Sequence, residues 1–232
     1  MTRTAARLLH ALLLTLAIAL APAAARAQEE TYKFDLGAGF GMSGYLGDVN
    51  QANMFRNPGF AAQAGMRYLI DTRWALRGVF TAAGLKGNSS QFSNKFPGLQ
   101  DYSFTSTIYG LDVRGEFNFL PYGIGETFKR LKRWSPYLAL GIGGVLSTSG
   151  GKVYGDFTVP MAVGFKFKLR ERLNLTAEFC MTKTFGDKLD GNISDLQGIR
   201  SDFVKNTDWH SNIIISLTYE FGKRCSTCHY KD

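Results

Sequence analysis

The sequence predicts an all-β fold: an eight-stranded antiparallel transmembrane β-barrel of the outer-membrane type, with short periplasmic turns and longer extracellular loops. Three observations lead to this prediction. The chain opens with the features of a secretory signal peptide, and no later segment has the roughly eighteen apolar residues of a membrane-spanning helix. Segments in which apolar residues alternate with small or polar ones recur along the chain. A closed barrel is the structure other than a helix that satisfies its backbone hydrogen bonds within lipid.

The first 27 residues have the order of regions that directs secretion. Arg3 and Arg7 are followed by an apolar run from Leu8 to Leu20 and then by small residues that end in Ala25-Arg26-Ala27. This order is typical of a cleaved signal peptide, and the apolar run is short for a spanning helix, although an uncleaved membrane anchor is the alternative. We expect a signal peptide, a barrel and a periplasmic C-terminal tail at residues 1–27, 28–222 and 223–232.

Charge and cysteine content exclude some classes of function. The formal net charge is +8, and removal of the signal peptide with its three arginines lowers it to +5. An exported protein with this mildly basic balance is not expected to bind nucleic acid. Three cysteines, Cys180, Cys225 and Cys228, do not make a disulfide framework.

The first expected strand, residues 32–43, shows the alternation most clearly. Its even positions are Tyr32, Phe34, Leu36, Ala38, Phe40 and Met42. Its odd positions are Lys33, Asp35, Gly37, Gly39, Gly41 and Ser43. Because successive side chains of a strand point to opposite faces, one face is apolar and the other is small or polar. A strand of this kind suits a wall between lipid and a polar interior.

The next three expected strands, residues 60–68, 74–81 and 109–119, repeat this pattern. Their apolar positions include Phe60, Ala62, Ala64, Met66, Tyr68, Trp74, Leu76, Phe80, Tyr109, Leu111, Val113, Phe117 and Phe119. The positions between them include Gln63, Gly65, Arg67, Arg77, Thr81, Asp112, Arg114, Glu116 and Asn118. Each segment therefore predicts another wall strand.

Four further strands are expected at residues 137–143, 157–168, 173–182 and 209–221, and the first of them alternates least cleanly. Their apolar positions include Leu138, Leu140, Ile142, Phe157, Val159, Met161, Val163, Phe165, Phe167, Leu173, Leu175, Phe179, Ile213, Ile215, Leu217 and Tyr219. The opposite positions include Gly141, Gly143, Thr158, Gly164, Lys166, Lys168, Asn174, Thr176, Glu178, Asn212, Ser216 and Glu220. The total of eight is even, as closure of these barrels normally requires.

The connections fall into two length classes on opposite sides of the strand map. Residues 71–73 and 170–172 are expected to be tight turns, and residues 46–57, 86–103, 147–156 and 186–207 are expected to be long polar loops. Outer-membrane barrels have short periplasmic turns and long outer loops, so both termini are expected in the periplasm. The connection 120–134 is the exception, since it is long and lies on the short-turn side.

The polar face carries charges of both signs. A soluble β-sandwich or lipocalin-like barrel, the alternative fold, would place the apolar faces in its core, and a soluble barrel fills its interior with apolar groups. Because eight strands enclose room only for side chains, we expect the charges to pair and to fill the lumen. The expected lumen charge plug consists of Asp112, Arg114, Glu116, Lys166, Glu178 and Glu220. A narrow ion or proton path is the functional alternative.

Cys225-Ser226-Thr227-Cys228-His229 is the sharpest chemical motif. C-x-x-C-H marks covalent haem attachment, but a short tail after the last strand supplies neither an apolar pocket nor a second axial ligand. Zinc also lacks ligands, since structural sites need four. We therefore treat Cys225 and Cys228 as disulfide candidates, with each other or with a partner.

No other motif indicates an enzyme. Asp187-Lys188-Leu189-Asp190-Gly191 does not have the spacing of an EF-hand calcium loop. His210 and Ser211 are neighbours on an expected strand, where they point to opposite faces and do not easily form a dyad. We expect no catalytic, metal or cofactor site, and no cofactor.

Several short stretches resemble one known family. They are Leu36-Gly37-Ala38-Gly39 to Tyr45-Leu46-Gly47-Asp48, Glu116-Phe117-Asn118-Phe119-Leu120-Pro121-Tyr122, Ser135-Pro136-Tyr137, Pro160 with Gly164-Phe165-Lys166, Asn174-Leu175 with Glu178, Thr184-Phe185 with Asp187 and Leu189-Asp190, and Phe221-Gly222-Lys223-Arg224. Together they make the chain similar to PorG-like outer-membrane β-barrel proteins of the Bacteroidetes type IX secretion system. Met181-Thr182-Lys183 departs from that pattern where an arginine is expected.

The resemblance implies a non-enzymatic barrel that supports protein secretion. It implies association with a periplasmic PorK-like lipoprotein and PorN-like ring proteins, besides outer-membrane lipid. An OmpX-like adhesin or structural barrel that acts through its outer loops is the alternative, and a lipid-modifying barrel enzyme is a third hypothesis.

The residues offer an independent hint about the partner surface. Basic residues gather on the expected periplasmic side, which suits an acidic protein surface or anionic headgroups, although a solvated rim would look the same. The expected partner-binding residues are Lys129, Arg130, Lys132, Arg133, Lys223 and Arg224.

Overall fold

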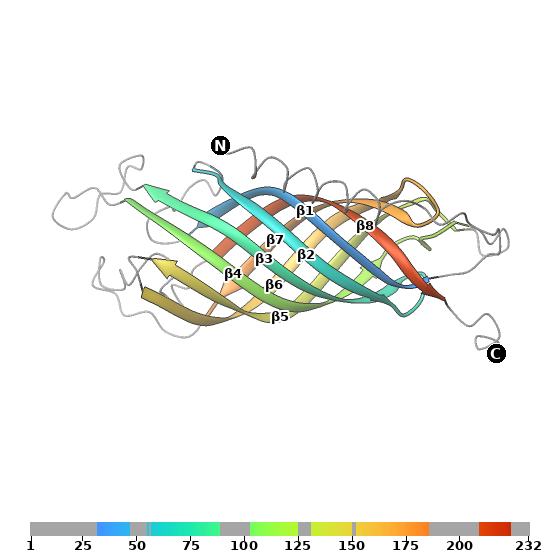
Figure 1. The fold of residues 1–232 in the computed structure, drawn as a ribbon, viewed down its shortest axis with the longest axis horizontal. Helices are drawn as coiled ribbons and strands as arrows, with labels where there is room; N and C mark the ends of the chain where they lie inside the picture. Colours follow the sequence, from blue (N-terminus) through green and yellow to red (C-terminus); the bar gives the residue numbers. More distant parts are fainter. Residues whose placement is uncertain are drawn as a thin grey trace, which may run out of the picture. The chain divides into compact units, whose positions relative to one another are not determined.

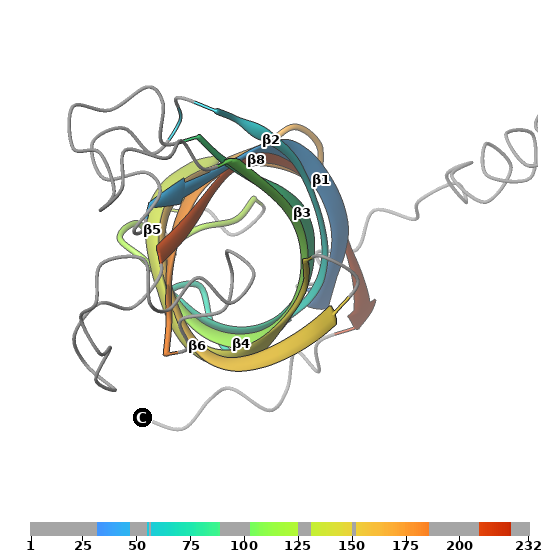
Figure 2. The same cartoon turned by 90° about the vertical axis from the view of Figure 1, so that its left-hand side faces the viewer.

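The computed structural model describes residues 32–46, 55, 57–88, 103–124, 131–149, 152–185 and 209–223. It contains eight strands in this part of the chain. They are β1 (Tyr32–Leu46), β2 (Gly59–Leu69), β3 (Trp74–Asn88), β4 (Ser103–Asn118), β5 (Trp134–Ser149), β6 (Lys152–Lys168), β7 (Leu173–Thr184) and β8 (Trp209–Lys223). Each pairs antiparallel with the next, and β8 returns to β1, so the sheet is a closed barrel (Figures 1 and 2).

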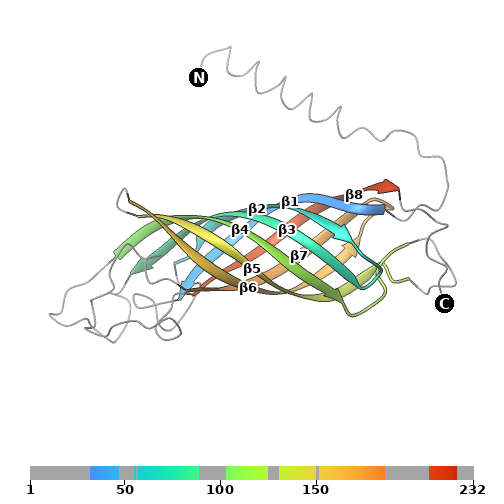
Figure 3. The same ribbon diagram turned by 90° about the horizontal axis from the view of Figure 1, so that it is seen from below.

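The strands cross the barrel obliquely (Figure 3), as closure of a sheet requires. The seam between β1 and β8 keeps one register from Tyr32, opposite Lys223, to Leu46, opposite Trp209, and only the Lys33 position is unpaired along it. No strand is left with an open edge along this seam. The predicted fold class, an eight-stranded antiparallel barrel, is confirmed.

Burial follows the alternation of the sequence. Leu140 and Val163, near the middle of β5 and β6, expose 61% and 49% of their surface, whereas Arg114 and Glu116 on β4 are almost completely buried. A soluble barrel would bury its apolar groups and expose its charges, because charges are costly in an apolar core. An apolar wall around a charged interior is the arrangement of outer-membrane barrels.

The region expected as the loop 147–156 is mostly strand, so that prediction was wrong. β5 runs to Ser149 and β6 begins at Lys152, which leaves only residues 150 and 151 between them. The alternation continues through this region with small polar residues on the inner face, such as the buried Ser147 beside the exposed Leu146. Their polar composition resembled that of a loop, but their period of two is that of a strand.

Two tight turns define one end of the barrel, which we call the turn end. In the β2–β3 turn, the side chain of Asp71 accepts hydrogen bonds from the backbone N–H groups of Arg73 (2.6 Å) and Trp74 (2.7 Å). In the β6–β7 turn, the N–H of Arg170 donates to the carbonyl of Leu173 at 3.1 Å. The opposite end, where β3 and β4 are joined, is the loop end.

The interior of the barrel differs between its two ends. Inward positions nearer the loop end form a buried apolar cluster of Tyr45, Ala61, Ala83, Leu85, Ile108, Val145 and Ile214. The charged side chains lie nearer the turn end. The sequence analysis expected charges inside and did not anticipate this apolar cluster.

One close contact inside the wall depends on a glycine. Gly164 on β6 is paired with Tyr137 on β5, and a Cβ built on Gly164 would lie 2.4 Å from Cζ of the tyrosine ring. Only glycine leaves room for the ring to lie over the neighbouring strand.

In the described ranges, no helix is long and apolar enough to cross a membrane.

Candidate functional site

Glu178 is the centre of the charged interior. Its carboxylate, on β7, accepts hydrogen bonds from Arg77 on β3 (2.5 Å) and Arg114 on β4 (3.0 Å). The hydroxyl of Tyr137 on β5 donates to the same carboxylate at 2.5 Å. Four strands are therefore joined at one carboxylate, and every one of these side chains is buried.

Glu116 is a second centre, closer to the turn end. It accepts from Nε of Arg67 at 3.1 Å and from Nζ of Lys166, and Nε of Arg77 lies 3.9 Å away. Lys166 also donates to the side chain of Asn118 at 3.0 Å. Arg77 thus connects the Glu178 and Glu116 centres.

A third group of contacts closes the network at the turn end. Arg67 donates to Asp35 at 2.5 Å, and the hydroxyl of Thr218 donates to the same carboxylate oxygen at 2.9 Å. Lys168 pairs with Glu220 at 2.6 Å. The amide of Asn174 donates to Glu220 at 3.0 Å and to Thr218 at 3.3 Å, which links the two pairs.

Among the described residues, the ion-paired side chains of the interior balance in charge. The five basic ones are Arg67, Arg77, Arg114, Lys166 and Lys168, and the five acidic ones are Asp35, Asp112, Glu116, Glu178 and Glu220. The structure thus places all six residues of the expected plug inside the lumen, where Asp112 pairs with Arg114 through two hydrogen bonds. Buried charges are tolerated when they are paired and hydrogen-bonded in this way.

The described parts of the connection between β4 and β5 contact the lumen network at the turn end. Tyr122 forms an isolated bridge with Lys132, and its N–H donates to the carbonyl of Thr72 in the β2–β3 turn at 3.1 Å. Its hydroxyl donates to Asn174 at 2.7 Å, and Nζ of Lys166 and of Lys168 lie 5.7 Å and 5.2 Å from the centre of its ring. We call the described parts of this connection, residues 119–124 and 131–133, the strap.

Burial raises the pKa of Tyr122, so its hydroxyl stays protonated at physiological pH and remains a hydrogen-bond donor. The sequence analysis did not find Tyr122, because no alternation marks a residue in a connection. The sequence analysis also did not identify Tyr137 and Asn174 as members of the lumen network. The alternation of side chains along a strand does predict that both point inward.

The predicted partner-binding residues lie partly within the described ranges. Lys132 and Arg133 follow one another in the strap, and both are exposed. Lys223 ends β8, opposite Tyr32, so the barrel reaches one residue further than the expected boundary. Lys129, Arg130 and Arg224 lie outside the described residues, as do the signal peptide and the disulfide candidates Cys225 and Cys228.

Other basic residues lie near the strap at the turn end. Arg73 and Arg170 are exposed, whereas Arg172 donates to the hydroxyls of Tyr32 (2.6 Å) and Tyr219 (3.3 Å). The guanidinium carbon of Arg172 also lies 4.6 Å from the ring centre of Tyr32. Arg172 therefore fixes the start of β1 to the β6–β7 turn. Arg73 donates to the carbonyl of Phe119 in the strap at 3.4 Å, and the exposed basic residues described at this end lie on the turns and the strap.

The described part of the chain contains no group of three His, Cys, Asp or Glu side chains that would hold a metal ion. His210 is buried, with Nδ1 at 3.5 Å from the hydroxyl of Thr184. Cys180 is a buried free thiol with Thr182 at 3.6 Å. These contacts join groups within the barrel.

Solved outer-membrane proteins share this architecture at low similarity. Neisserial surface protein A is 13% identical, with a TM-score of 0.49 over 81% of this chain and 97% of that one. Ail of Yersinia pestis, in complex with the heparin analogue sucrose octasulfate, is 11% identical, with a TM-score of 0.47 over 82% and 100%. A major outer membrane protein of Thermus thermophilus is 13% identical, with a TM-score of 0.47 over 82% and 100%.

At these values the likeness says nothing about activity or binding. No curated protein matches the sequence. One family, described as a domain of unknown function (DUF6089), matches residues 8–230. Since this match spans nearly the whole sequence, the chain belongs to the DUF6089 family.

Proposed function

We propose that this protein is a non-enzymatic outer-membrane component of a type IX protein secretion apparatus, which docks or anchors periplasmic ring proteins. The observation that carries the proposal is the strap: a long connection, held against the turn end, that presents exposed basic side chains. The resemblance to PorG-like proteins supplies the identity of the apparatus. In this proposal the turn end and both termini face the periplasm.

The filled lumen supports a docking role over a transport role. Paired charges occupy the turn half and an apolar cluster occupies the loop half. An eight-stranded barrel has room for little else. The useful surfaces are therefore the two ends and the lipid-facing wall.

The strap suits a protein partner because it adds area and charge. A specific interface usually needs about 800 Å² on each partner, which tight turns alone do not supply. Lys132 and Arg133 on the strap, with Arg73 and Arg170 on the turns, give this end a positive field that would steer an acidic partner. By resemblance, the partners are a PorK-like lipoprotein and PorN-like ring proteins.

The test uses two variants of the full protein in its native host. One reverses charge at Lys129, Arg130, Lys132 and Arg133, each to Glu, and the other ends the chain after Lys223, so that β8 keeps its pairing with Tyr32. We expect normal barrel insertion, loss of secretion, and loss of ring proteins from the purified barrel. Lys86→Glu, an exposed charge reversal on β3 towards the loop end, is the matched control.

Normal secretion and ring association in both variants would contradict the proposal.

The second candidate, an OmpX-like adhesin, is favoured by one observation. β3 and β4 pair as far as Asn88 and Ser103, past the last β2–β3 pair at Ala61 and Ala83. The β3–β4 pair therefore extends further towards the loop end than the β2–β3 pair does. Deletion of residues 91–100 would then abolish attachment to surfaces and leave secretion unchanged.

A further inference from the structure

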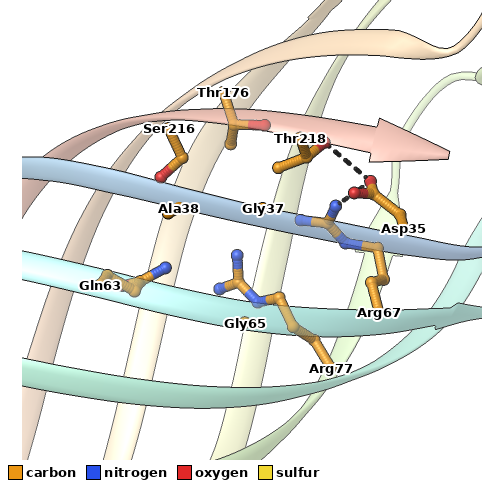
Figure 4. Close-up of a pocket in the computed structure, with 10 residues that line it drawn as sticks. All are labelled: Asp35, Gly37, Ala38, Gln63, Gly65, Arg67, Arg77, Thr176, Ser216 and Thr218. Carbon is orange, nitrogen blue, oxygen red and sulfur yellow. Dashed lines mark hydrogen bonds and ion pairs between the residues drawn. The ribbon is translucent and has the colours of Figure 1, made fainter. Parts of the chain in front are cut away.

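A small cavity of about 20 Å³ lies inside the barrel, beside the ion-pair network (Figure 4). Its wall includes Asp35, Arg67, Arg77, Thr176 and Thr218. Gly37 and Gly65 also line it. A cavity of this size holds one water molecule, for which about 10–15 Å³ is enough.

Three buried polar atoms of this wall have no hydrogen-bond partner in the described part of the chain. They are Oδ1 of Asp35, Nε of Arg77 and Oγ1 of Thr176, on β1, β3 and β7. The other oxygen of Asp35 is already bound by Arg67 and Thr218 (Figure 4). Buried polar groups without a protein partner are commonly satisfied by ordered water, and these three line a single cavity.

The chemistry of the wall selects a neutral occupant with both donors and acceptors. A chloride ion would accept from Arg77 but would be repelled by the carboxylate of Asp35. A sodium ion would bind Asp35 and Thr176 but would be repelled by the guanidinium of Arg77. Because the ion pairs of the described residues already balance, they leave no net charge for an ion to neutralise.

We propose that this cavity binds one structural water molecule, which accepts a hydrogen bond from Nε of Arg77 and donates to Oδ1 of Asp35 and Oγ1 of Thr176. The water completes the polar network by joining three strands that are not neighbours in the barrel. It satisfies three groups with one molecule, within the two to four partners that buried waters usually have.

The first test is a high-resolution crystal structure of the barrel purified in detergent. We expect a density peak at about 2.7–3.2 Å from all three atoms, in the wild type and in Thr176→Ser, which keeps the hydroxyl. In Thr176→Val, which has nearly the same volume without the hydroxyl, the peak should vanish or move away from the valine. A cavity without density in the wild type, or an unchanged peak in Thr176→Val, would overturn the proposal.

Two further measurements separate water from an ion and the crystal from solution. Crystals soaked in bromide or rubidium salts should show no anomalous peak in the cavity, and a peak for either ion would contradict a neutral occupant. In solution, oxygen-17 magnetic relaxation dispersion should detect one long-lived water fewer in Thr176→Val than in Thr176→Ser. Equal numbers in the two variants would also count against the site.

Discussion

At the scale of single residues, the interior depends on side chains that each serve several partners. Glu178 receives two guanidinium groups and one phenol, and Arg114 binds Asp112 through two nitrogen atoms while it also reaches Glu178. Removal of one member of such a set is costly because the others stay buried without compensation. Single substitutions in the network should therefore have large effects.

Glu178→Gln should destabilise the folded barrel by about 3–5 kcal/mol, because Arg77 and Arg114 would lose a buried counter-charge. The measurement is equilibrium unfolding by guanidinium in detergent micelles. Glu171→Gln, in the exposed β6–β7 turn, is the control and should change stability by less than about 0.5 kcal/mol. Equal stability of the two variants would mean that the network contributes little.

Gly164→Ala should destabilise the barrel by about 1–3 kcal/mol, because the added methyl overlaps the ring of Tyr137 and forces it away from Glu178. Gly78→Ala on β3 is the matched control, since a Cβ there meets nothing within 4 Å. The same unfolding experiment compares the two. If Gly78→Ala proved the more damaging of the pair, the account of the Tyr137 contact would be wrong.

At the scale of elements, each strand has two faces that meet different surroundings. On β5, Leu138, Leu140 and Ile142 are exposed on the wall, whereas Tyr137 and Ala139 are buried in the lumen. A substitution on one face of a strand should therefore have a different consequence from the same substitution on the other face. The strap adds a second kind of element, which is held by a few specific contacts instead of a ladder.

Arginine on the outer face should lower the stability of the barrel more, the closer its position lies to the middle of the membrane. Leu140→Arg and Val163→Arg, near the strand centres, should each cost about 2–4 kcal/mol, because they put a charge in the middle of the hydrocarbon. Thr107→Arg, an exposed position on β4 towards the loop end, should cost only about 0–1 kcal/mol.

Folding equilibria in phospholipid vesicles test this depth dependence. Thr176→Arg points into the lumen and should act by crowding the network, so its cost should not depend on lipid thickness. Equal tolerance of arginine at both central wall positions would contradict the assignment of faces.

Tyr122→Ala should release the strap from the mouth of the lumen. It removes the hydrogen bond to Asn174 and the ring that faces Lys166 and Lys168. Hydrogen exchange of the amides of Tyr122 and Gly123 should become faster, whereas exchange in β4 and β5 stays slow. Tyr122→Phe keeps the ring and should cost only about 1 kcal/mol for the lost hydrogen bond. Unchanged exchange in Tyr122→Ala would show that backbone contacts alone hold the strap.

At the scale of the whole molecule, closure and filling act together. The seam between β1 and β8 removes sheet edges, and the ion pairs and apolar cluster fill the space that closure creates. In the described part of the chain, paired charges, an apolar cluster and small polar side chains together occupy much of the lumen. This filling supports the proposal that the protein acts through its surfaces.

The mature protein should be heat-modifiable. Because a closed barrel keeps its backbone hydrogen bonds within itself, it should migrate as a compact species on gels after mild detergent and shift only after boiling. Far-ultraviolet circular dichroism of the unboiled sample should be dominated by β-structure. Substantial helix, or solubility without detergent, would contradict the barrel in membranes.

The strands were open to prediction because alternation is a local property. The pattern from Tyr32 to Ser43 appears in the residues themselves, and the structure keeps it with Asp35 inside and Leu36 outside. The local signal failed at residues 147–156, where small polar inward residues resembled a loop. For the lumen, the alternation of side chains along each strand identified the six charged residues of the expected plug as inward. It gave no information about Tyr122, which lies in a connection.

The sequence by itself thus determined that eight strands, each with one apolar and one polar face, would enclose a charged interior. Adjacent residues are enough to show an alternation with a period of two. Only the tertiary structure decided which charges meet. Arg77 and Glu178 are separated by 101 positions, and closure of the barrel brings them to 2.5 Å. It also decided that an apolar cluster forms in the loop half of the lumen and that Tyr122 contacts the charged side chains of the turn half, because both depend on residues from several strands at one height in the barrel. Such contacts are set by register and closure, which act between distant segments and leave no trace in any single one.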